Sequence, residues 1–584
     1  MKDWTLPTFL QLKKNSKKET DGFAKYRMVL LGDCATQHIA QALRGYAYEE
    51  EIALELLDTD YNQILAQVMD DASELYQFGA DAVLLVMCSE KLYEVYLETA
   101  VEERKEFAQR KYEEISQIWQ RLHLYKNLET GKGFKILQFN FAENDDRCFG
   151  NYAGHVESSF IFQLRKLNLL LMQGAQEEDI YLVDVSYVQN LYGCRLFHDE
   201  KLYYIAKMPF STEVLPAIAR EVISIVKTLM AKFKKCVILD LDQTLWGGVI
   251  GDDGLEGIQI GELGLGHAYQ EFQCWLKELT KRGILLAVCS KNDEEKAKEP
   301  FLKHPEMVLR LEDIAVFIAN WEDKASNIKK IIEILNLGTD SFVFLDDNPF
   351  ERNLVRSMLP EIAVPELPED PAKYLSYLKE WNLFETVSYS SADQDRTRQY
   401  REEAGRTALK QQFSTYEEYL QNLEMVAEAK PFDAFHIPRI AQLSQRSNQF
   451  NLRTVRLSEE EAAALATDNT YITLYFTLKD RFGDHGLISV VVLKKEKECL
   501  FIENWLMSCR VLKRTMEAFI INTIMEEAEK AGAEKVIGEY IKTPKNAMVE
   551  HIYEEMGFRP VGNNRYERKT DSREKLTTWI ARAK

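Results

Sequence analysis

The chain has 584 residues, of which 46% are hydrophobic and 28% charged, as in an ordinary soluble protein with several domains. Its formal net charge of -20 argues against a nucleic acid as the main partner, because the phosphate backbone is itself anionic. No apolar run reaches the ~20 residues of a membrane-spanning helix, and the polar N-terminal segment lacks the apolar stretch of a signal peptide. The nine cysteines follow no paired spacing, so we expect reduced thiols in the cytoplasm and no membrane partner.

The first third of the chain alternates predicted strands with predicted helices. Apolar runs predict strands at residues 26–31, 82–87, 133–139 and 179–185. Amphipathic patterns predict a long charged helix at 91–124 and a second helix at 156–173. Strands that alternate with helices indicate a parallel α/β sheet, and we place this first domain at residues 22–210.

The middle of the chain repeats this alternation and predicts a second α/β domain at residues 230–375. A helix predicted at 211–233 leads into it. The predicted strands lie at 236–239, 284–289, 316–318 and 341–345, and the predicted helices at 268–282 and 324–335. A proline-bearing segment at 364–371 marks the predicted exit from this domain.

The last third begins with a charged helix predicted at 390–410 and then changes its pattern. Three strands, a helix, a strand and a final helix are predicted at 471–478, 486–494, 500–507, 511–531, 535–540 and 546–556. Paired antiparallel strands followed by a helix indicate an α+β, acyltransferase-like domain, which we place at residues 410–570. The predicted fold class is therefore α/β, with three domains in one chain.

Two aspartates, Asp240 and Asp242, directly follow the predicted buried strand at 236–239. Side chains two residues apart in an extended chain point the same way, so both carboxylates can serve one reaction centre. A carboxylate pair at the carboxyl end of a strand suits Mg²⁺ and a phosphoryl group. A solvated turn would carry such a pair equally well, so this motif decides nothing by itself.

Further polar groups follow in the same domain, each at the end of a predicted strand or the start of a predicted helix. They are Ser290 with Lys291 and Asn292, then Lys324, and last Asp346 with Asp347. Open α/β sheets bind ligands at this edge, so the complete set is hard to explain as a series of solvated turns.

This order resembles the four motifs of the haloacid dehalogenase (HAD) phosphohydrolase superfamily. The resemblance implies that Asp240 is the nucleophile that forms an aspartyl-phosphate and that Asp242 is the general acid/base. It implies Mg²⁺ as the cofactor, held by Asp240, by Asp242 through its main-chain carbonyl, and by Asp346 and Asp347. It also implies a set of phosphate-binding residues, namely Thr244, Ser290, Lys291, Asn292 and Lys324.

The intervals between these motifs are short. The first holds only a loop, at 246–265, and one helix, and the second, which ends at Lys324, holds little beyond a helix and a strand. Neither can contain a cap domain, so we expect an open site suited to a macromolecular substrate or to closure by a neighbouring domain. The glycine-rich segment at 247–254, with Trp246 at its base, is either a flap over a small ligand or a tight turn.

Longer strings narrow the resemblance to the FkbH-like family. They are LDLDQTLWGGVIGDDGLEGI at 239–258, CSKND at 289–293, FLDDNPFER at 344–352, LSQRSNQFNLRT at 443–454, DRFGDHGLI at 480–488, WLMSCRVLKR at 505–514 and KTPKNAMV at 542–549. Members of that family resemble a fusion of an SGNH-hydrolase-like domain, a capless HAD domain and a GNAT-like domain, in the order of the three predicted domains. One departure is Gln243, where the family typically has asparagine.

The resemblance implies an activity in two parts. FkbH-like proteins of polyketide pathways take the glyceryl group of 1,3-bisphosphoglycerate, release phosphate and load glycerate as a thioester on an acyl carrier protein. The implied partners are a small phosphorylated substrate and the phosphopantetheine arm of that carrier. One alternative is a HAD phosphatase that acts on a sugar phosphate or another phosphorylated small molecule, with flanking domains that bind partners. A non-enzymatic platform is the third reading, which the intact HAD motifs disfavour.

The Gly32-Asp33-Cys34 corner of the first domain stands where an SGNH hydrolase carries Gly-Asp-Ser. Near the end of the domain the order is His198-Asp199, whereas the family has Asp-x-x-His. Cys34 is therefore either a thiolate nucleophile or part of a scaffold domain that binds a partner, and we favour the scaffold.

Cys509, in the third domain, lies where a predicted strand meets a predicted helix, a position that stabilises a thiolate. It is our leading candidate for a transient glyceryl thioester, and a buried structural cysteine is an equally weighted alternative. The nearby Arg510, Lys513 and Arg514 add positive charge that suits the phosphate of phosphopantetheine.

Two further sites are a turn with two alternative roles and a cysteine expected in the core. Asp484 and His485 lie on a predicted turn between strands and are either a source of a catalytic base or an ordinary hairpin turn. Cys289 points away from Ser290 by strand alternation, so we expect it in the core.

Overall fold

The computed structural model describes residues 4–583 apart from 126–132, 388, 390–395, 411–412, 414, 448–449, 454, 456, 458, 509–510, 544–545 and 572–574. The chain divides into two compact units. The first comprises residues 1–311, 317–329 and 337–394, and the second comprises 312–316, 330–336 and 395–584. Three sheets organise the chain, in agreement with the predicted α/β class.

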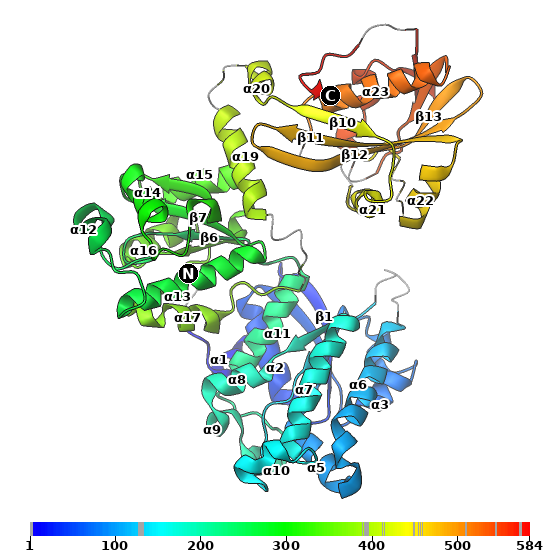
Figure 1. Cartoon of the computed structure of the whole chain (residues 1–584). Coiled ribbons are helices and arrows are strands. Elements are labelled where there is room, and N and C mark those ends of the chain that lie inside the picture. Colours follow the sequence, from blue (N-terminus) through cyan, green and yellow to red (C-terminus); the bar gives the residue numbers. More distant parts are fainter. Residues whose placement is uncertain are drawn as a thin grey trace. The chain divides into compact units, whose positions relative to one another are not determined.

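The first unit contains a five-stranded sheet in which every neighbouring pair is parallel (Figure 1). The strand order is β2–β1–β3–β4–β5. The bounds are β1 Ala24–Gly32, β2 Ile52–Asp58, β3 Ala82–Val86, β4 Lys135–Phe139 and β5 Ile180–Val183. Four of these strands confirm the sequence prediction, and β2 was missed because its glutamate and terminal aspartate interrupt the apolar run.

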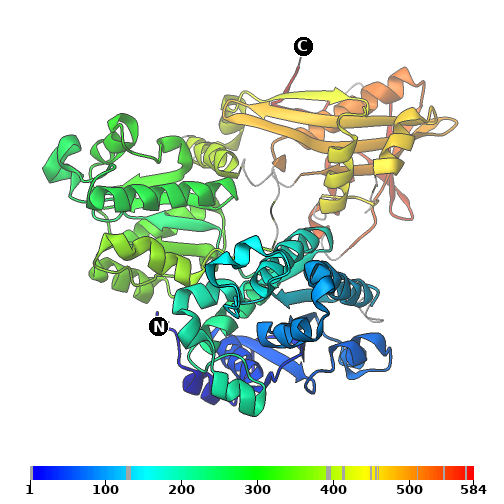
Figure 2. The same ribbon diagram turned by 60° about the horizontal axis from the view of Figure 1, so that its bottom comes forward.

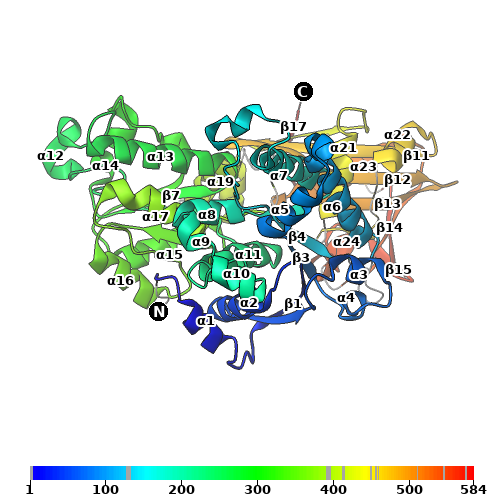
Figure 3. The same cartoon turned by 90° about the horizontal axis from the view of Figure 1, so that it is seen from below.

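Helices cover both faces of this sheet, as Figures 1 and 3 show. Met28 and Leu30 of β1 pack in a core with α1, α2 and α11, whereas Val29 and Leu31 pack in a second core with α3, α6 and α7. The helices are α1 Phe9–Asn15, α2 Gln37–Glu49, α3 Ile64–Met69, α4 Glu74–Gln77, α5 Ser89–Glu98, α6 Phe107–His123, α7 Phe160–Glu177, α8 Val185–Tyr192, α9 Cys194–Phe197, α10 Glu200–Ala206 and α11 Leu215–Leu229. Continuous apolar strands are what a sheet covered on both faces requires.

The single long helix predicted at 91–124 is wrong, because the chain breaks between α5 and α6. A short 3₁₀ helix at Val101–Glu106 fills the gap. The guanidinium of Arg104 folds back, donates to the carbonyl oxygens of Thr99 and Leu97 at 3.1 and 3.2 Å, and lies over the ring of Tyr96. These bonds satisfy the free carbonyls at the end of α5, so the charged pattern continues while the helix does not.

A second sheet, which belongs mostly to the first unit, has the order β8–β7–β6–β9, and its β6–β7 and β6–β9 pairs are parallel. Its strands are β6 Cys236–Leu239, β7 Leu285–Ser290, β8 Ile314–Ala319 and β9 Phe342–Leu345. The helices between and after them are α12 Ile250–Gly257, α13 Leu265–Lys281, α14 Glu294–Lys303, α15 Lys324–Leu335, α16 Pro349–Met358 and α17 Tyr374–Trp381. β6 and α15 have the predicted bounds, and the edge strand β9 pairs in parallel with β6, so the two strands end side by side.

Residues 240–324, all of which the structure describes, contain no cap domain. The segment predicted as a loop holds one short helix, α12, which lies at the outer edge of its sheet in Figures 1 and 3. Two backbone hydrogen bonds between Gly247 and Gln259 (2.7 and 3.0 Å) join the two ends of the loop that contains α12. Gly248, with φ of +89°, supplies the turn that leads into it.

The second unit contains a mainly antiparallel, eight-stranded sheet in the order β15–β16–β14–β13–β12–β11–β10–β17. The strands are β10 Val426–Lys430, β11 Tyr471–Asp480, β12 Gly483–Lys495, β13 Cys499–Met507, β14 Lys535–Glu539, β15 Arg559–Gly562, β16 Arg565–Lys569 and β17 Ala581–Arg582. The helices are α19 Arg396–Lys410, α20 Tyr416–Asn422, α21 Ile437–Arg446, α22 Glu459–Thr467, α23 Met516–Lys530 and α24 Ile552–Glu555.

α23 covers one face of this sheet, and α21 and α22 cover the other, as Figures 1 and 2 show. The predicted succession of antiparallel strands, helix and strand is confirmed. α23 starts five residues later than predicted because Lys513 and Thr515 adopt positive φ, which a right-handed helix cannot contain. Among the described residues, none of the helices has the length and apolar character that a membrane span requires.

Candidate active site

A buried lysine between two aspartates forms the centre of the candidate site. The Lys324 ammonium lies 2.8 Å from Oδ2 of Asp240 and 2.5 Å from Oδ2 of Asp346. Asp240 and Asp346 directly follow β6 and β9, which are neighbours in the sheet, and Lys324 is the first residue of α15. The sequence prediction that these residues lie together is therefore confirmed.

The electrostatics of this centre depend on its burial, since the side chain of Lys324 is only 4% exposed and that of Asp346 is fully buried. Burial opposes the charged lysine, but the two carboxylates outweigh it and raise the pKa of Lys324 above its ordinary value. Burial and the neighbouring charge of Asp240 raise the pKa of Asp346. One ammonium thus faces two carboxylates, so the centre has a net negative charge that a further cation would neutralise.

Three carboxylates fit a divalent cation. Oxygens of Asp240, Asp346 and Asp347 all lie within 4.8 Å of one another. Burial and the charge of Asp240 also raise the pKa of Asp347, as expected for carboxylates that share one small volume. Carboxylate oxygens are hard ligands of the kind that Mg²⁺ prefers, so the donor set suits the predicted metal.

The carboxylate of Asp242 is held by three donors. Its Oδ1 accepts from the indole N–H of Trp246 at 2.9 Å and from the backbone N–H of Ile250 at 3.0 Å. Its Oδ2 accepts from the side-chain amide of Asn292 at 3.1 Å. Burial raises the pKa of Asp242 despite these bonds. Trp246 is fully buried at the start of the loop that contains α12, and its indole N–H orients the carboxylate of Asp242.

Arg352 fixes the loop that carries the second acidic pair. Its guanidinium donates to the carbonyl oxygens of Asp346 and Asp347 at 2.8 and 2.7 Å, and it is also paired with Glu366. The hydroxyl of Thr244 accepts from the backbone N–H of Asp347 at 3.1 Å. Sequence reasoning assigned Arg352 no role, although it lies in the quoted string FLDDNPFER, because only the folded loop brings the two carbonyls to it.

The remaining predicted phosphate ligands come from the end of β7. Ser290 is the last residue of that strand and is buried. The ammonium of Lys291 lies 2.6 Å from Oε1 of Glu351, whose side chain is 7% exposed. Cys289 is fully buried, as predicted, and burial raises the pKa of its thiol to about 12.

Gln243 adopts a left-handed backbone conformation, with φ of +57°, immediately after Asp242. Its carbonyl oxygen accepts from the hydroxyl of Tyr374 at 3.1 Å, which fixes this turn. Asparagine tolerates such a conformation better than glutamine. We expect Gln243→Asn to raise the free energy of unfolding by about 0.5–1 kcal/mol, measured by urea denaturation.

The matched control for this change is Gln270→Asn, which makes the same substitution within the helix α13. Asparagine is the poorer helix former, so this variant should lose a few tenths of a kcal/mol, or about 0.5 kcal/mol at most. Equal effects of the two substitutions would contradict the backbone argument.

The Gly32-Asp33-Cys34 corner is buried in the first sheet, where Cys34 is 1% exposed. Its thiol lies near that of Cys88, which comes from the end of β3, and the backbone N–H of Cys88 donates to Asp33 at 3.0 Å. The contact with the Cys34 thiol, then burial and the nearby acidic charges, keep the pKa of the Cys88 thiol well above its ordinary value. His198 pairs instead with Glu90, at 3.0 Å. A buried thiol of this kind supports the scaffold interpretation.

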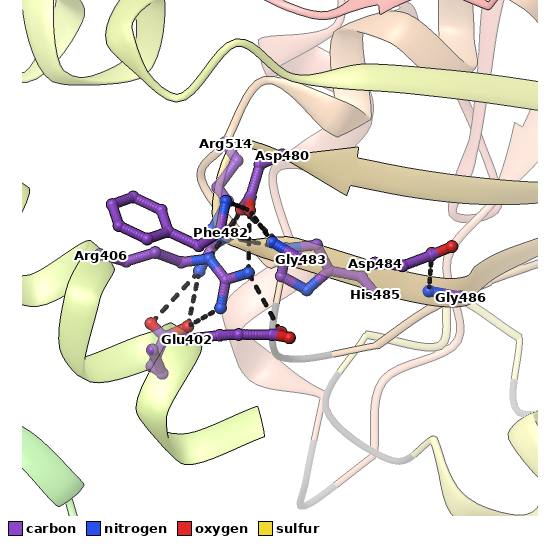
Figure 4. A network of polar contacts seen from close by, with 10 residues as sticks. Glu402, Arg406, Asp480, Phe482, Gly483, Asp484, His485, Gly486 and Arg514 are labelled. Carbon is purple, nitrogen blue, oxygen red and sulfur yellow. Dashed lines mark hydrogen bonds and ion pairs between the residues drawn. The ribbon is translucent and has the colours of Figure 1, made fainter. Parts of the chain in front are cut away.

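The third domain is only partly described at its predicted site. Cys509 and Arg510 lie outside the described residues, so the predicted thioester position stays a prediction. Asp484 does not pair with His485: it accepts from the backbone N–H of Gly486 (Figure 4). Its carboxylate also pairs with Lys479, at 3.1 Å. The partner of His485 is Asp480, at 2.9 Å, which the local sequence pattern did not indicate.

Comparison with known proteins relates a large part of the chain to a protein family and to a solved structure. Residues 27–227 match the family model described as FkbH, N-terminal domain. The crystal structure of the N-terminal part of the protein BF1531 from Bacteroides fragilis, described as containing a phosphatase domain complexed with Mg, is 44% identical, with a TM-score of 0.62. The match covers 66% of this chain and all of that one. The comparison with curated proteins gives no match.

Two acetyltransferase structures match the chain over a much shorter region. The ribosomal-protein-S18-alanine N-acetyltransferase of Escherichia coli is 16% identical, covers 24% of this chain and 88% of its own, and has a TM-score of 0.19. The spermidine N-acetyltransferase of Vibrio cholerae, in complex with CoA and spermine, is 15% identical, covers 25% and 96%, and has a TM-score of 0.21.

Proposed function

The chain belongs to the FkbH-like family, and from this membership we propose that it is a Mg²⁺-dependent HAD-type enzyme that transfers a glyceryl group to an acyl carrier protein and releases phosphate. The observation that carries the phosphoryl half is Lys324, which lies between Asp240 and Asp346 in a buried centre. The Bacteroides fragilis protein, described as containing a phosphatase domain complexed with Mg, supports the same chemistry.

In the phosphoryl step, Asp240 attacks the phosphorus of the phosphate ester of the substrate, in line with the departing ester oxygen, so the acyl phosphate stays intact for the transfer. The bond from phosphorus to that oxygen breaks, an aspartyl-phosphate forms on Asp240, and Asp242 gives its proton to the departing oxygen, which leaves as a hydroxyl group. Asp242 then takes a proton from the water that hydrolyses the aspartyl-phosphate. Lys324 offsets the negative charge of the incoming phosphate.

A raised pKa suits Asp242 for this role, because a general acid must hold its proton near neutral pH. Trp246, Ile250 and Asn292 fix its direction, so the proton is delivered to one place. Asp240, Asp346 and Asp347 would hold Mg²⁺, which supplies charge neutralisation for the approach of two anions. Thr244 and Arg352 position the loop that carries two of these carboxylates.

The acyl half is assigned to the second unit and its partner to an acyl carrier protein with a phosphopantetheine arm. The absence of a cap domain from residues 240–324 supports the proposal of a large partner at the phosphoryl site. We propose the three domain limits 22–210, 230–375 and 410–570, and the cytoplasm as the compartment, since all cysteines of the described residues are free thiols.

The test is intact-protein mass spectrometry after incubation with 1,3-bisphosphoglycerate and Mg²⁺, with and without a carrier protein bearing phosphopantetheine. We expect phosphate release together with a glyceryl mass increase on the enzyme or on the carrier. Phosphate release with no adduct on either protein would leave a simple phosphatase and exclude the transfer. A parallel incubation with EDTA should abolish phosphate release if Mg²⁺ is required.

A further inference from the structure

A buried aspartate organises a charged cluster in the second unit (Figure 4). The side chain of Asp480, at the end of β11, is fully buried. Arg406 of α19 donates to both of its oxygens, from Nε to Oδ2 at 2.7 Å and from Nη2 to Oδ1 at 2.9 Å. The backbone N–H groups of Phe482 and Gly483 donate to Oδ1 at 2.9 and 3.1 Å. Burial opposes the charged form of Asp480, but the contacts with His485 and Arg406 outweigh burial and lower the pKa of this group, so it is a carboxylate at neutral pH.

The same carboxylate sets the tautomer of His485. Nε2 of His485 lies 2.9 Å from Oδ2 of Asp480, and an ionised carboxylate can only accept, so Nε2 carries the proton. Arg514 Nη1 lies 3.4 Å from both atoms, and because a guanidinium only donates, its hydrogen is directed to the carboxylate. When the ring is neutral, its lone pair is therefore on Nδ1, for which no hydrogen bond is found within the described part of the chain.

This arrangement of carboxylate, oriented imidazole and free ring nitrogen is that of a general base. It lies against the segment that joins β13 to α23, because Arg514 belongs to that segment and the backbone N–H of Ser508 donates to Ile488 at 2.8 Å. Building on the function proposed above, we propose that His485 is the general base of the acyl transfer and takes the proton from the thiol of the phosphopantetheine arm.

The step balances without any further reactant. Nδ1 of His485 takes the S–H proton, and the sulfur attacks the carbonyl carbon of the glyceryl phosphate anhydride. The bond from that carbon to the phosphate oxygen breaks, phosphate leaves, and a thioester forms. The proton then passes from the imidazole to the leaving phosphate or to water. The reaction is distinct from the Asp240 chemistry, which breaks a bond to phosphorus.

The contacts of Arg406 and Arg514 show which part of the cluster is structural. Arg406 also pairs with Glu402 and Glu403, and Arg514 pairs with Glu403, so α19 is fastened to the β11–β12 hairpin by salt bridges. These salt bridges require Asp480 and the two arginines, and they do not involve Nδ1 of His485. A purely structural imidazole would be replaceable by an isosteric amide.

The test measures phosphate release and thioester formation separately, with 1,3-bisphosphoglycerate as donor and pantetheine as the thiol. We expect His485→Gln to slow thioester formation at pH 7 by about 10²–10⁴-fold, the usual contribution of a general base. Phosphate release at the Asp240 site, measured without pantetheine so that the thioester step contributes none, should stay within about twofold of the wild type. The thioester deficit should shrink about tenfold for each unit of pH up to the thiol pKa of about 8.5, because hydroxide then generates the thiolate. Imidazole added to His485→Ala should restore part of the rate.

The matched control is His436→Gln. His436 also contacts an aspartate, with Nδ1 2.9 Å from both oxygens of Asp433, but that pair lies at the start of α21, where Asp433 also accepts from the hydroxyl of Tyr475 at 3.0 Å. It should leave thioester formation unchanged. A wild-type rate in His485→Gln, or a deficit that neither imidazole nor higher pH reduces, overturns the proposal alone. Phosphate release without any thioester in the wild type overturns the transfer function itself, and this proposal with it.

Discussion

Asp240→Asn is expected to reduce phosphate release by more than about 10⁴-fold, as removal of a nucleophile does in enzymes that form covalent intermediates. The amide cannot attack phosphorus, yet it has the same shape as the carboxylate. The lysine would keep its second contact, with Asp346 at 2.5 Å, so we expect the fold to survive. Single-turnover assays with 1,3-bisphosphoglycerate and Mg²⁺ measure the loss.

Asp252→Asn is the matched control for this prediction. Asp252 is an exposed aspartate of α12, twelve residues after Asp240. Its substitution by asparagine removes the same charge but leaves the buried centre unchanged. Its phosphate release should stay within about twofold of the wild type. If Asp240→Asn retained wild-type turnover, with the thermal unfolding temperature unchanged, the nucleophile would have to be another group.

Much of the candidate site followed from the sequence because its residues lie at the ends of strongly apolar strands. The strand at 236–239 and the helix at 324–335 have the predicted bounds, which placed Asp240 and Lys324 at one edge of a parallel sheet. Whether Asp240 and Lys324 come into contact then depends only on which strands are neighbours in the sheet. A parallel sheet with short crossovers leaves few choices.

The parts that sequence reasoning missed depend on contacts between distant residues. Arg104 ends α5 by folding back onto its carbonyls, and nothing in the amphipathic pattern signals this bond. Arg352 acts through carbonyl groups, which every residue possesses, so its targets carry no sequence signal. His485 takes its partner from five residues earlier, across the β11–β12 turn, while the adjacent Asp484 turns to Gly486. Local order shows which groups are present, but tertiary packing selects their partners.

Lys324→Met should destabilise the first unit by about 3–5 kcal/mol at pH 7, because it leaves two buried carboxylates without their cation. The methionine keeps most of the volume of the lysine stem, so loss of charge dominates over loss of packing. Lys281→Met, which removes an exposed ammonium paired with Glu278 on the same sheet's helix α13, is the control and should change stability by less than about 0.5 kcal/mol.

The pH dependence of the Lys324→Met deficit identifies its cause. The pKa of Asp346 is already raised in the folded state, by burial and then by Asp240, and removal of the ammonium raises it further. A carboxyl group whose pKa is raised in the folded state does not lower the free energy of unfolding at a pH below its ordinary pKa. As the pH rises from that ordinary pKa to the pKa of the folded state, the group destabilises the fold progressively. The deficit should therefore be largest near pH 8 and smaller near pH 5, as measured by urea unfolding in Mg²⁺-free buffer. A deficit of equal size at both pH values would mean that Lys324 stabilises the fold through packing, and not through its charge.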